Sequence, residues 1–389
     1  MGGRRYEILG IVGRGSAGTV YYARMQGEGG FFKDVALKVL HPVGQRDGTD
    51  LAQRLRDEAR VLGLVSHRSI VGADALVQLN GRWTVVMEYV PGANLFDLTR
   101  DPSVHAADPD EVPRQALPPR VAVEILGAMA GALDVAYHTR GSDAQPLRLL
   151  HRDLKPSNLR ITRNGEVKIL DFGFAKADFR QREAKTRHLS YGSLGYVPHE
   201  QLEGRESAQG DVYSSGVILY EMLAGESFGQ TPMTPARHDR RLGARLTTLR
   251  EKLPDLQPAV VDLMAHMLSF RPEERPRAAE VEQRCADLAP SLERPDLRAW
   301  ARSNVPAESA LLPEGDDPMV GRLVREDSTE PIRFVTLSST ASAPAPVELQ
   351  RPRRPQLWAW APLVGAVMAV LATGAVLIAL IGIWLGLSL

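Results

Sequence analysis

The sequence predicts an α+β fold, in which strands gather near the N-terminus and helices follow. Residues 8–12, 19–23 and 34–40 are apolar, β-branched or aromatic, which is typical of strands. In residues 51–64, leucine and alanine recur at near-helical spacing instead. With 389 residues, the chain is long enough for two packed lobes and some extra length.

The composition argues against several classes of protein. Lysine plus arginine and aspartate plus glutamate number 47 each, so no excess of positive charge favours nucleic acid. The single cysteine, Cys285, excludes a disulfide framework within the chain and fits a reducing compartment. Residues 1–6 contain no apolar run, so we expect no signal peptide.

Residues 13–20 contain the pattern Gly-x-Gly-x-x-Gly, which alone is weak evidence for a nucleotide site. A dinucleotide-binding turn would require a helix directly after the glycines. The β-branched and aromatic residues 19–23 predict a second strand there. The pattern therefore favours a hairpin whose glycines let backbone amides approach phosphate groups without a Cβ in the way.

Lys38 interrupts the apolar strand 34–40. A lysine that points inward from such a strand is costly unless it is paired; the alternative is an exposed lysine on an edge strand. The expected partner is an acid on the predicted helix 51–64, which carries Asp57 and Glu58. These two adjacent acids would lie about 100° apart around that helix.

The most informative stretch is His-Arg-Asp-Leu-Lys-Pro-Ser-Asn at residues 151–158, followed by Asp-Phe-Gly at 171–173. Transfer of a phosphoryl group from ATP requires an acid that holds the attacking hydroxyl in line, and an amide and a second acid that hold magnesium. Two such motifs at this separation rarely coincide by chance. The sequence resembles the serine/threonine protein kinases.

The resemblance implies a role for each polar residue of the two motifs. Asp153 would accept or orient the proton of the attacking hydroxyl, and Asn158 would hold one magnesium ion. Asp171 would bridge magnesium to the phosphates. Lys155 follows the serine/threonine pattern, which disfavours a tyrosine-specific enzyme.

The resemblance also implies an ATP site between two lobes. Lys38, braced by Glu58, would hold the α- and β-phosphates, and backbone groups of Glu88 and Val90 would bind the adenine edge beside the gatekeeper Met87. The side chains alone would equally suit a core strand that ends in a Pro-Gly turn. The implied nucleotide contacts are Gly13, Arg14, Gly15, Ser16, Ala17, Gly18, Val20, Ala36, Lys38, Glu58, Met87, Glu88, Val90 and Asp171.

Arg160 departs from the family pattern, which often places an apolar residue beneath the adenine ring at this position. We expect the aliphatic stem of Arg160 to serve there while its guanidinium reaches solvent.

Residues 171–200 resemble an activation segment that ends in Pro-His-Glu, where the family usually has Ala-Pro-Glu. The resemblance implies a buried ion pair between Glu200 and Arg275. It further implies that Asp211 supports the catalytic loop.

Arg152 precedes the catalytic aspartate, a feature of kinases that are switched on by phosphate in the activation segment. A phosphate on Thr186 or Ser190 would add about −1.5 to −2 charges and pair with this arginine. The alternative, that these hydroxyls are ordinary loop residues, has equal weight.

Residues 290–356 lack apolar periodicity and are rich in proline, serine, threonine and charge, which predicts a flexible linker. Leu357–Leu389 then contains no charged residue, and we predict a transmembrane helix over 357–387 rather than a buried globular helix. Arginines directly before this helix favour a cytoplasmic location for the preceding domain.

We therefore expect a bilobal kinase domain over residues 6–289, with an N-lobe at 6–90 and a C-lobe at 91–289, followed by the linker and the membrane helix. This organisation resembles bacterial eukaryotic-like (Hanks-type) serine/threonine kinases, with the kinase domain on the cytoplasmic face of the inner membrane. The expected cofactors are ATP and Mg²⁺. The expected partners are proteins that bear serine or threonine and the lipid bilayer, but not nucleic acid; self-association is left open.

Two alternatives from other functional classes remain. A pseudokinase scaffold, motivated by Arg160 and by Pro198-His199, would bind nucleotide or partners without turnover. A membrane adaptor would instead recruit proteins through the proline-rich segment 290–355.

Overall fold

A computed structural model of the chain describes residues 4–15, 18–41, 63–100, 114–141, 144–172, 194–327 and 332–333. These residues lie in one compact unit, residues 1–336. The second unit, residues 337–389, lies outside the described residues, and so does the predicted membrane helix 357–387. Most of the predicted helix 51–64, with Glu58, also lies outside them.

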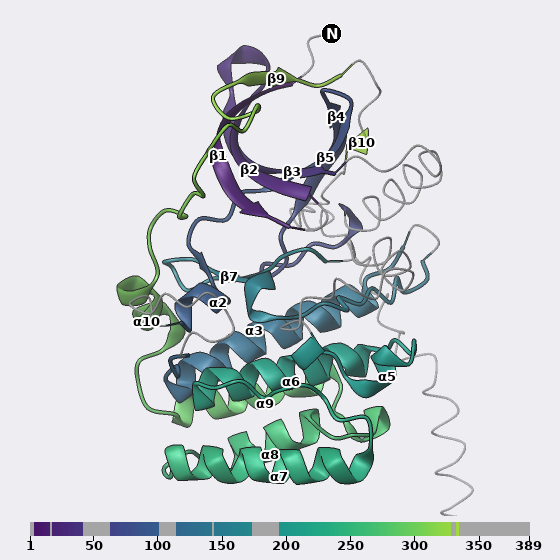
Figure 1. Cartoon of the computed structure of the whole chain (residues 1–389), viewed down its shortest axis with the longest axis vertical. Coiled ribbons are helices and arrows are strands. Elements are labelled where there is room, and N and C mark those ends of the chain that lie inside the picture. The colour runs from purple at the N-terminus through teal and green to yellow at the C-terminus, as the bar shows by residue number, and fades with distance from the viewer. Residues whose placement is uncertain are drawn as a thin grey trace, which may run out of the picture. The chain divides into compact units, whose positions relative to one another are not determined.

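The N-terminal strands form one antiparallel sheet, which curves into a ring at the top of Figure 1. Its strands follow the order β10-β4-β5-β3-β2-β1-β9. Alternate residues of β1 and β2 point inward and are buried, as expected for apolar and β-branched sequences. The predicted strands at 8–12, 19–23 and 34–40 are confirmed. The bounds are β1 (Arg5–Arg14), β2 (Gly18–Gln26), β3 (Phe32–Leu40), β4 (Ala73–Leu79) and β5 (Arg82–Glu88), with a short 3₁₀ turn η1 (Glu28–Gly30) between β2 and β3.

The second lobe is helical, and its core surrounds α6. Ser207 caps the start of α6 by accepting a hydrogen bond from Gly210 N at 3.3 Å, and Gly225 ends it in the left-handed conformation. Nearly every residue of α6 between these caps is buried. The helices are α2 (Leu95–Leu98), α3 (Pro119–His138), α5 (His199–Leu202), α6 (Ala208–Ala224), α7 (Pro235–Lys252), α8 (Pro258–Met267), α9 (Ala278–Leu288) and α10 (Leu297–Asn304).

Helix α3 packs against α6 and α9, and a small sheet covers its other side. Among the described residues, α3 is the one helix long and apolar enough to cross a membrane, but most of it is buried in the helical lobe. The small sheet and the remaining 3₁₀ turns are β6 (Ala93–Asn94), β7 (Leu159–Ile161), β8 (Val167–Ile169), η3 (Pro156–Asn158), η5 (Pro272–Glu274) and η6 (Ala289–Ser291).

The prediction of a flexible linker from residue 290 is wrong for residues 290–327, which are part of the fold. They contain α10, whose Trp300 is buried against the helical core, and strand β9 (Leu323–Arg325), which pairs with β1. A further strand, β10 (Ile332–Arg333), pairs with β4. C-terminal chain thus pairs with β1 and β4, so neither of these strands is an exposed edge, and the short strands β9 and β10 form the edges instead.

Candidate active site

The motif at 151–158 follows α3 and leads into β7, and its polar side chains contact one another. The carboxylate of Asp153 accepts a hydrogen bond from Lys155 Nζ at 2.9 Å and one from Asn158 Nδ2 at 3.3 Å. Asn158 Nδ2 also donates to the backbone carbonyl of Asp153 at 2.7 Å. The three residues predicted to act in catalysis therefore lie together in one loop.

These contacts orient the Asn158 amide. Because its Nδ2 is held by Asp153, its Oδ1 is the end turned away, and amide and carboxylate oxygens are ligands that hard cations prefer. Leu170 N donates to Asn158 O at 2.8 Å, which brings the following residue, Asp171, alongside. The structure therefore places together the two residues predicted to hold a metal.

Lys38 on β3 contacts Asp171 in the helical lobe. Lys38 Nζ lies 2.5 Å from Asp171 Oδ1, and the lysine side chain is 7% exposed while that of the aspartate is 40% exposed. Loss of solvent opposes ionisation of Asp171, but the charge and hydrogen bond of Lys38 outweigh it and hold the pKa of Asp171 below its usual value. The carboxylate is therefore ionised at neutral pH. Pairing of Lys38 with Glu58 stays a prediction, because Glu58 lies outside the described residues.

The buried Asp211 supports the catalytic loop, as the resemblance implied. Its two carboxylate oxygens accept hydrogen bonds from the backbone N–H groups of His151 and Arg152, each at 2.8 Å. His151 in turn places its Nε2 2.8 Å from the carbonyl of Leu170, and its ring packs edge-on against Phe172. One buried acid is thus connected through His151 to the segment that carries Asp171.

Two residues of this site have left-handed backbone conformations: Arg152, with φ at 68°, and Asp171, with φ at 57°. Such conformations cost free energy for residues other than glycine and persist where surrounding contacts hold them. Here the hydrogen bond that Asp211 accepts from Arg152 N stabilises the first residue, and the contact with Lys38 stabilises the second. Two of the five non-glycine residues with positive φ in the described part of the chain therefore lie in this site.

Arg152 does not point freely toward solvent. Its Nε donates to Glu206 at 2.7 Å, and Gln201 Nε2 donates to its carbonyl at 2.7 Å. The two hydroxyls predicted to carry an activating phosphate, Thr186 and Ser190, lie outside the described residues, so their pairing with Arg152 stays a prediction. Sequence reasoning missed Glu206, because nothing in its local sequence marks it as the partner of a residue 54 positions away.

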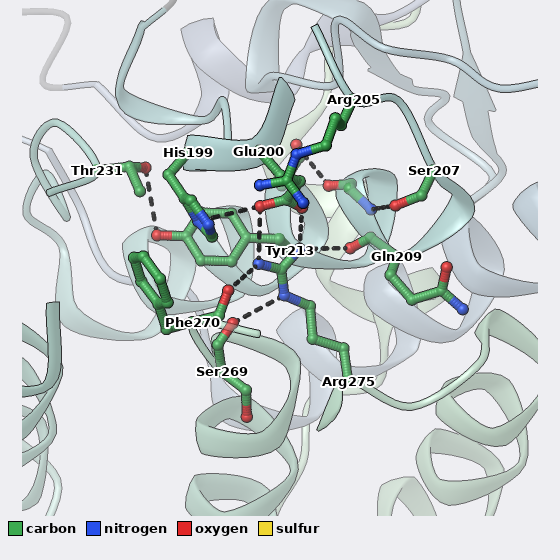
Figure 2. A network of polar contacts seen from close by, with 12 residues as sticks. His199, Glu200, Arg205, Ser207, Gln209, Tyr213, Thr231, Ser269, Phe270 and Arg275 are labelled. Carbon is green, nitrogen blue, oxygen red and sulfur yellow. Dashed lines mark hydrogen bonds and ion pairs between the residues drawn. The ribbon is translucent and has the colours of Figure 1, made fainter. Parts of the chain in front are cut away.

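The predicted ion pair between Glu200 and Arg275 is confirmed (Figure 2). The two guanidinium nitrogens donate to the two carboxylate oxygens at 2.5 and 3.2 Å, and both side chains are at most 2% exposed. The guanidinium also donates to the backbone carbonyls of Ser269, Phe270 and Gln209. Every charge in this pair is compensated, which is the condition under which a buried ion pair is tolerated.

His199, which departs from the family pattern, belongs to the same network (Figure 2). Its ring stacks on Phe270 with centroids 3.7 Å apart, and its Nδ1 lies 3.1 Å from Glu200 Oε2. Burial lowers the pKa of His199, and the nearby Glu200 only partly offsets this effect. A neutral imidazole therefore packs here and donates to Glu200, so the departure leaves the ion pair intact.

The glycine-rich segment forms a hairpin between β1 and β2, as predicted, and no helix follows it. Gly15 N donates to Gly18 O at 2.9 Å, and Gly18 N donates back to Gly15 O. A Cβ at Gly18 would lie 2.3 Å from the Val39 carbonyl, so this position requires glycine. Ser16 and Ala17 lie outside the described residues.

The remaining nucleotide residues predicted from sequence gather on the central strands. Ala36 and Lys38 share one face of β3, and the register places Val20 opposite Lys38 and Met87 opposite Ala36. The chain then passes from β5 through Glu88 to the second lobe. Their contacts with a nucleotide stay a prediction.

The prediction for the Arg160 guanidinium is wrong. Instead of reaching solvent, it is buried and donates to the backbone carbonyls of Val90 at 2.6 Å and Gly92 at 2.8 Å. Both belong to residues 88–92, the connection between the lobes, here called the hinge. It also contacts Asn94 Oδ1 at 3.0 Å and the hydroxyl of Ser309. The cause is the ordered C-terminal segment, which covers a position that we expected to face water.

Comparisons with known proteins agree with this geometry. Residues 6–285 match the protein kinase domain family. The chain is 30% identical to the tyrosine-protein kinase MasK of Myxococcus xanthus over 71% of its length and 41% of the relative's. It is 30% identical to the probable serine/threonine-protein kinase PknB of Lactococcus lactis, and 34% identical to the serine/threonine-protein kinase PknB of Mycobacterium leprae. These two alignments cover 74% and 60% of this chain, and 42% and 35% of the relatives.

The chain therefore spans less than half the length of these curated relatives. Among solved structures, the kinase domain of PknI from Mycobacterium tuberculosis superposes with a TM-score of 0.51 at 24% identity. The superposition covers 72% of this chain and 95% of that domain. At this identity the likeness establishes the fold alone.

Replacement of Glu200 by alanine should lower the free energy of unfolding by about 3–5 kcal/mol, because Arg275 would remain buried without a counter-charge. Chemical denaturation of the full-length protein measures this loss. The control is Glu203→Ala, which removes an exposed ion pair with Arg205 and should change stability far less. Equal effects of the two substitutions would contradict the assignment of Glu200 as a structural anchor.

Proposed function

The chain belongs to the protein kinase domain family, and we propose that it transfers the γ-phosphoryl group of ATP to serine and threonine hydroxyls of proteins. The single observation that carries this proposal is the convergence of Asp153, Lys155 and Asn158 beside the contact between Lys38 and Asp171. Each group required for in-line transfer is present and braced by a neighbour.

In this mechanism Asp153 holds the attacking hydroxyl and accepts its proton. The hydroxyl oxygen forms a bond to the γ-phosphorus as the bond to the β,γ-bridging oxygen breaks, and the charge leaves with ADP. Lys155, 2.9 Å from the Asp153 carboxylate, provides positive charge where the transferred group gains negative charge. Lys38 anchors the phosphates from the opposite lobe.

The donor set fits a nucleotide-bound divalent cation. Within the described residues, no group of three or more His, Cys, Asp or Glu could hold a metal by itself. Asn158 Oδ1 and the Asp171 carboxylate supply two hard oxygens, which suits Mg²⁺ that takes its other ligands from phosphates and water. When bound, Mg²⁺ would neutralise phosphate charge and favour departure of ADP.

Selectivity for serine and threonine is supported by Lys155 and by the names of several relatives. One relative, MasK, is named a tyrosine-protein kinase, so the acceptor residue has to be measured. The pseudokinase alternative rested on Arg160 and His199. His199 packs beside an intact ion pair, which weakens that alternative.

We further propose that residues 357–387 anchor the kinase domain to the cytoplasmic face of the cell membrane, where it acts in signal transduction. The support is the sequence alone: Leu357–Leu389 contains no charged residue, and arginines precede it. Autophosphorylation of the activation segment at Thr186 or Ser190 is the proposed switch, with Arg152 as the phosphate's partner. Self-association through the membrane helix would bring two activation segments together.

Full-length protein incubated with γ-labelled ATP and Mg²⁺ should label itself, and acid hydrolysis should release phosphoserine and phosphothreonine. Asp153→Asn should lower the rate by about 10²–10⁴-fold, because it removes the proton acceptor. The matched control, Asp262→Asn, changes an exposed acid on α8 and should keep the wild-type rate. Label confined to phosphotyrosine would refute the acceptor assignment, and a folded wild type that binds ATP without turnover would favour the scaffold.

Membrane anchoring predicts that the full-length chain, expressed in bacteria, stays with membranes after an alkaline carbonate wash. The double substitution Leu377→Arg and Leu380→Arg should release the protein from the membrane. Each arginine in the centre of a transmembrane helix costs about 2.5–3.5 kcal/mol of insertion free energy. Alanine at the same two positions is the control and should keep the protein in the membrane fraction. Retention of the arginine variant would count against a spanning helix.

A further inference from the structure

The segment 305–327, here called the strap, connects the helical lobe to the far edge of the N-terminal sheet. Its start is fixed by α10, where Leu297 N donates to Glu124 of α3 at 2.6 Å. In Figure 1 the chain leaves α10 and runs up the side of the molecule to β9 at the top of the ring. The strap begins 20 residues after the end of the matched family region at residue 285.

The first contact of the strap is with Arg160, which also contacts the hinge. Ser309 is buried, and its hydroxyl accepts a hydrogen bond from the Arg160 guanidinium. The same guanidinium donates to the carbonyls of Val90 and Gly92. Arg160 therefore joins strap and hinge through a single rigid group, whose fork of N–H donors fixes the geometry of all its acceptors.

The second contact is with the glycine-rich strand β1. Leu312 N donates to the carbonyl of Ile11 at 2.8 Å. The side chain of Leu311 lies over Gly10, where an added Cβ would come within 2.7 Å of Leu311 Cδ1. With glycine at this position, the Leu311 side chain packs directly over the backbone of β1.

The third contact holds both strands of the glycine-rich hairpin. The Asp317 carboxylate is 5% exposed and accepts hydrogen bonds from Arg14 NH2 at 3.2 Å and from the hydroxyl of Tyr21 at 3.2 Å. Arg14 ends β1, and Tyr21 lies in β2. Burial, together with the nearby Asp317, raises the pKa of Tyr21, so its hydroxyl remains a donor at neutral pH.

The end of the strap closes the sheet into the ring of Figure 1. Tyr6 OH donates to Glu326 at 2.8 Å, and β9 pairs with β1. Asp327 N then donates to the carbonyl of Gln78 in β4, and its carboxylate accepts from Gly81 N at 2.7 Å. Strands at opposite edges of the sheet are thereby tied by one short segment.

We propose that the strap positions the glycine-rich hairpin relative to the hinge and is therefore an intramolecular part of the nucleotide site, with Arg160, Ser309 and Asp317 as its positioning residues. The strap contacts the hairpin directly through Asp317, and it contacts the hinge through Ser309 and Arg160. The inference rests on the proposed function, because it assigns the strap to the site that binds ATP.

The test compares the affinity of the full-length, detergent-solubilised protein for a non-hydrolysable ATP analogue with Mg²⁺, by calorimetry. Asp317→Asn weakens the hold on the hairpin without touching the hinge, and its control is Asp316→Asn, an exposed neighbour. Ser309→Ala removes the acceptor from Arg160, and its control is Ser303→Ala, which is exposed on α10. Arg160→Leu, with the exposed Arg163→Leu as control, is a third pair.

We expect Asp317→Asn and Ser309→Ala each to raise the Kd by about tenfold, the scale of one buried hydrogen bond. In steady-state assays the KM for ATP should rise more than kcat falls, since neither residue belongs to the catalytic loop. The controls should match the wild type. These two variants decide the proposal even if Arg160→Leu fails to fold.

Variants with lower Tm but an unchanged Kd would overturn the proposal and leave the strap a purely structural element. A wild type that binds the analogue but transfers no phosphate would refute the kinase activity alone, and the Kd comparison would still decide the role of the strap. A wild type that binds no nucleotide would overturn both.

Discussion

The contact between Lys38 and Asp171 is the interaction on which the site depends. A lysine buried on an apolar strand is costly without a counter-charge, and here the charge comes from the other lobe. The pair therefore fixes β3 against the start of the second motif. It also places one cationic and one anionic group at the same point, where phosphate and a divalent cation would both have to be bound.

The position of the Asp171 carboxylate depends on a chain of contacts that begins at Asp211. Asp211 holds the backbone of His151, whose ring holds the carbonyl of Leu170, and Asp171 follows directly in a left-handed conformation. The same acid stabilises the left-handed Arg152 at the start of the catalytic loop. Substitutions in this chain of contacts would therefore act on the site without touching a substrate, because strained backbone is retained only while its surroundings hold it.

Much of the site could be predicted from the sequence because its contacts are local. Asp153 and Asn158 lie five positions apart, and their mutual hydrogen bonds follow from one short loop. The family pattern indicated the pair of Glu200 with Arg275, which lie 75 positions apart, but non-local contacts outside that pattern were missed. The guanidinium of Arg160 was expected in solvent, because its acceptor Ser309 lies 149 positions away in a segment without periodicity. Apolar pairs within 290–327, such as Met319-Val320 and Leu323-Val324, were the signal that this segment packs.

The most direct test of the central claim is the Mg²⁺ dependence of nucleotide binding in the full-length protein, measured for the wild type and for Asp171→Asn. If Lys38 and Asp171 bring phosphate and cation together, Mg²⁺ should tighten binding of a non-hydrolysable ATP analogue to the wild type, and the variant should lose most of that gain. The exposed substitution Asp262→Asn should keep it. An Asp171→Asn variant with the wild-type Mg²⁺ dependence would contradict the account.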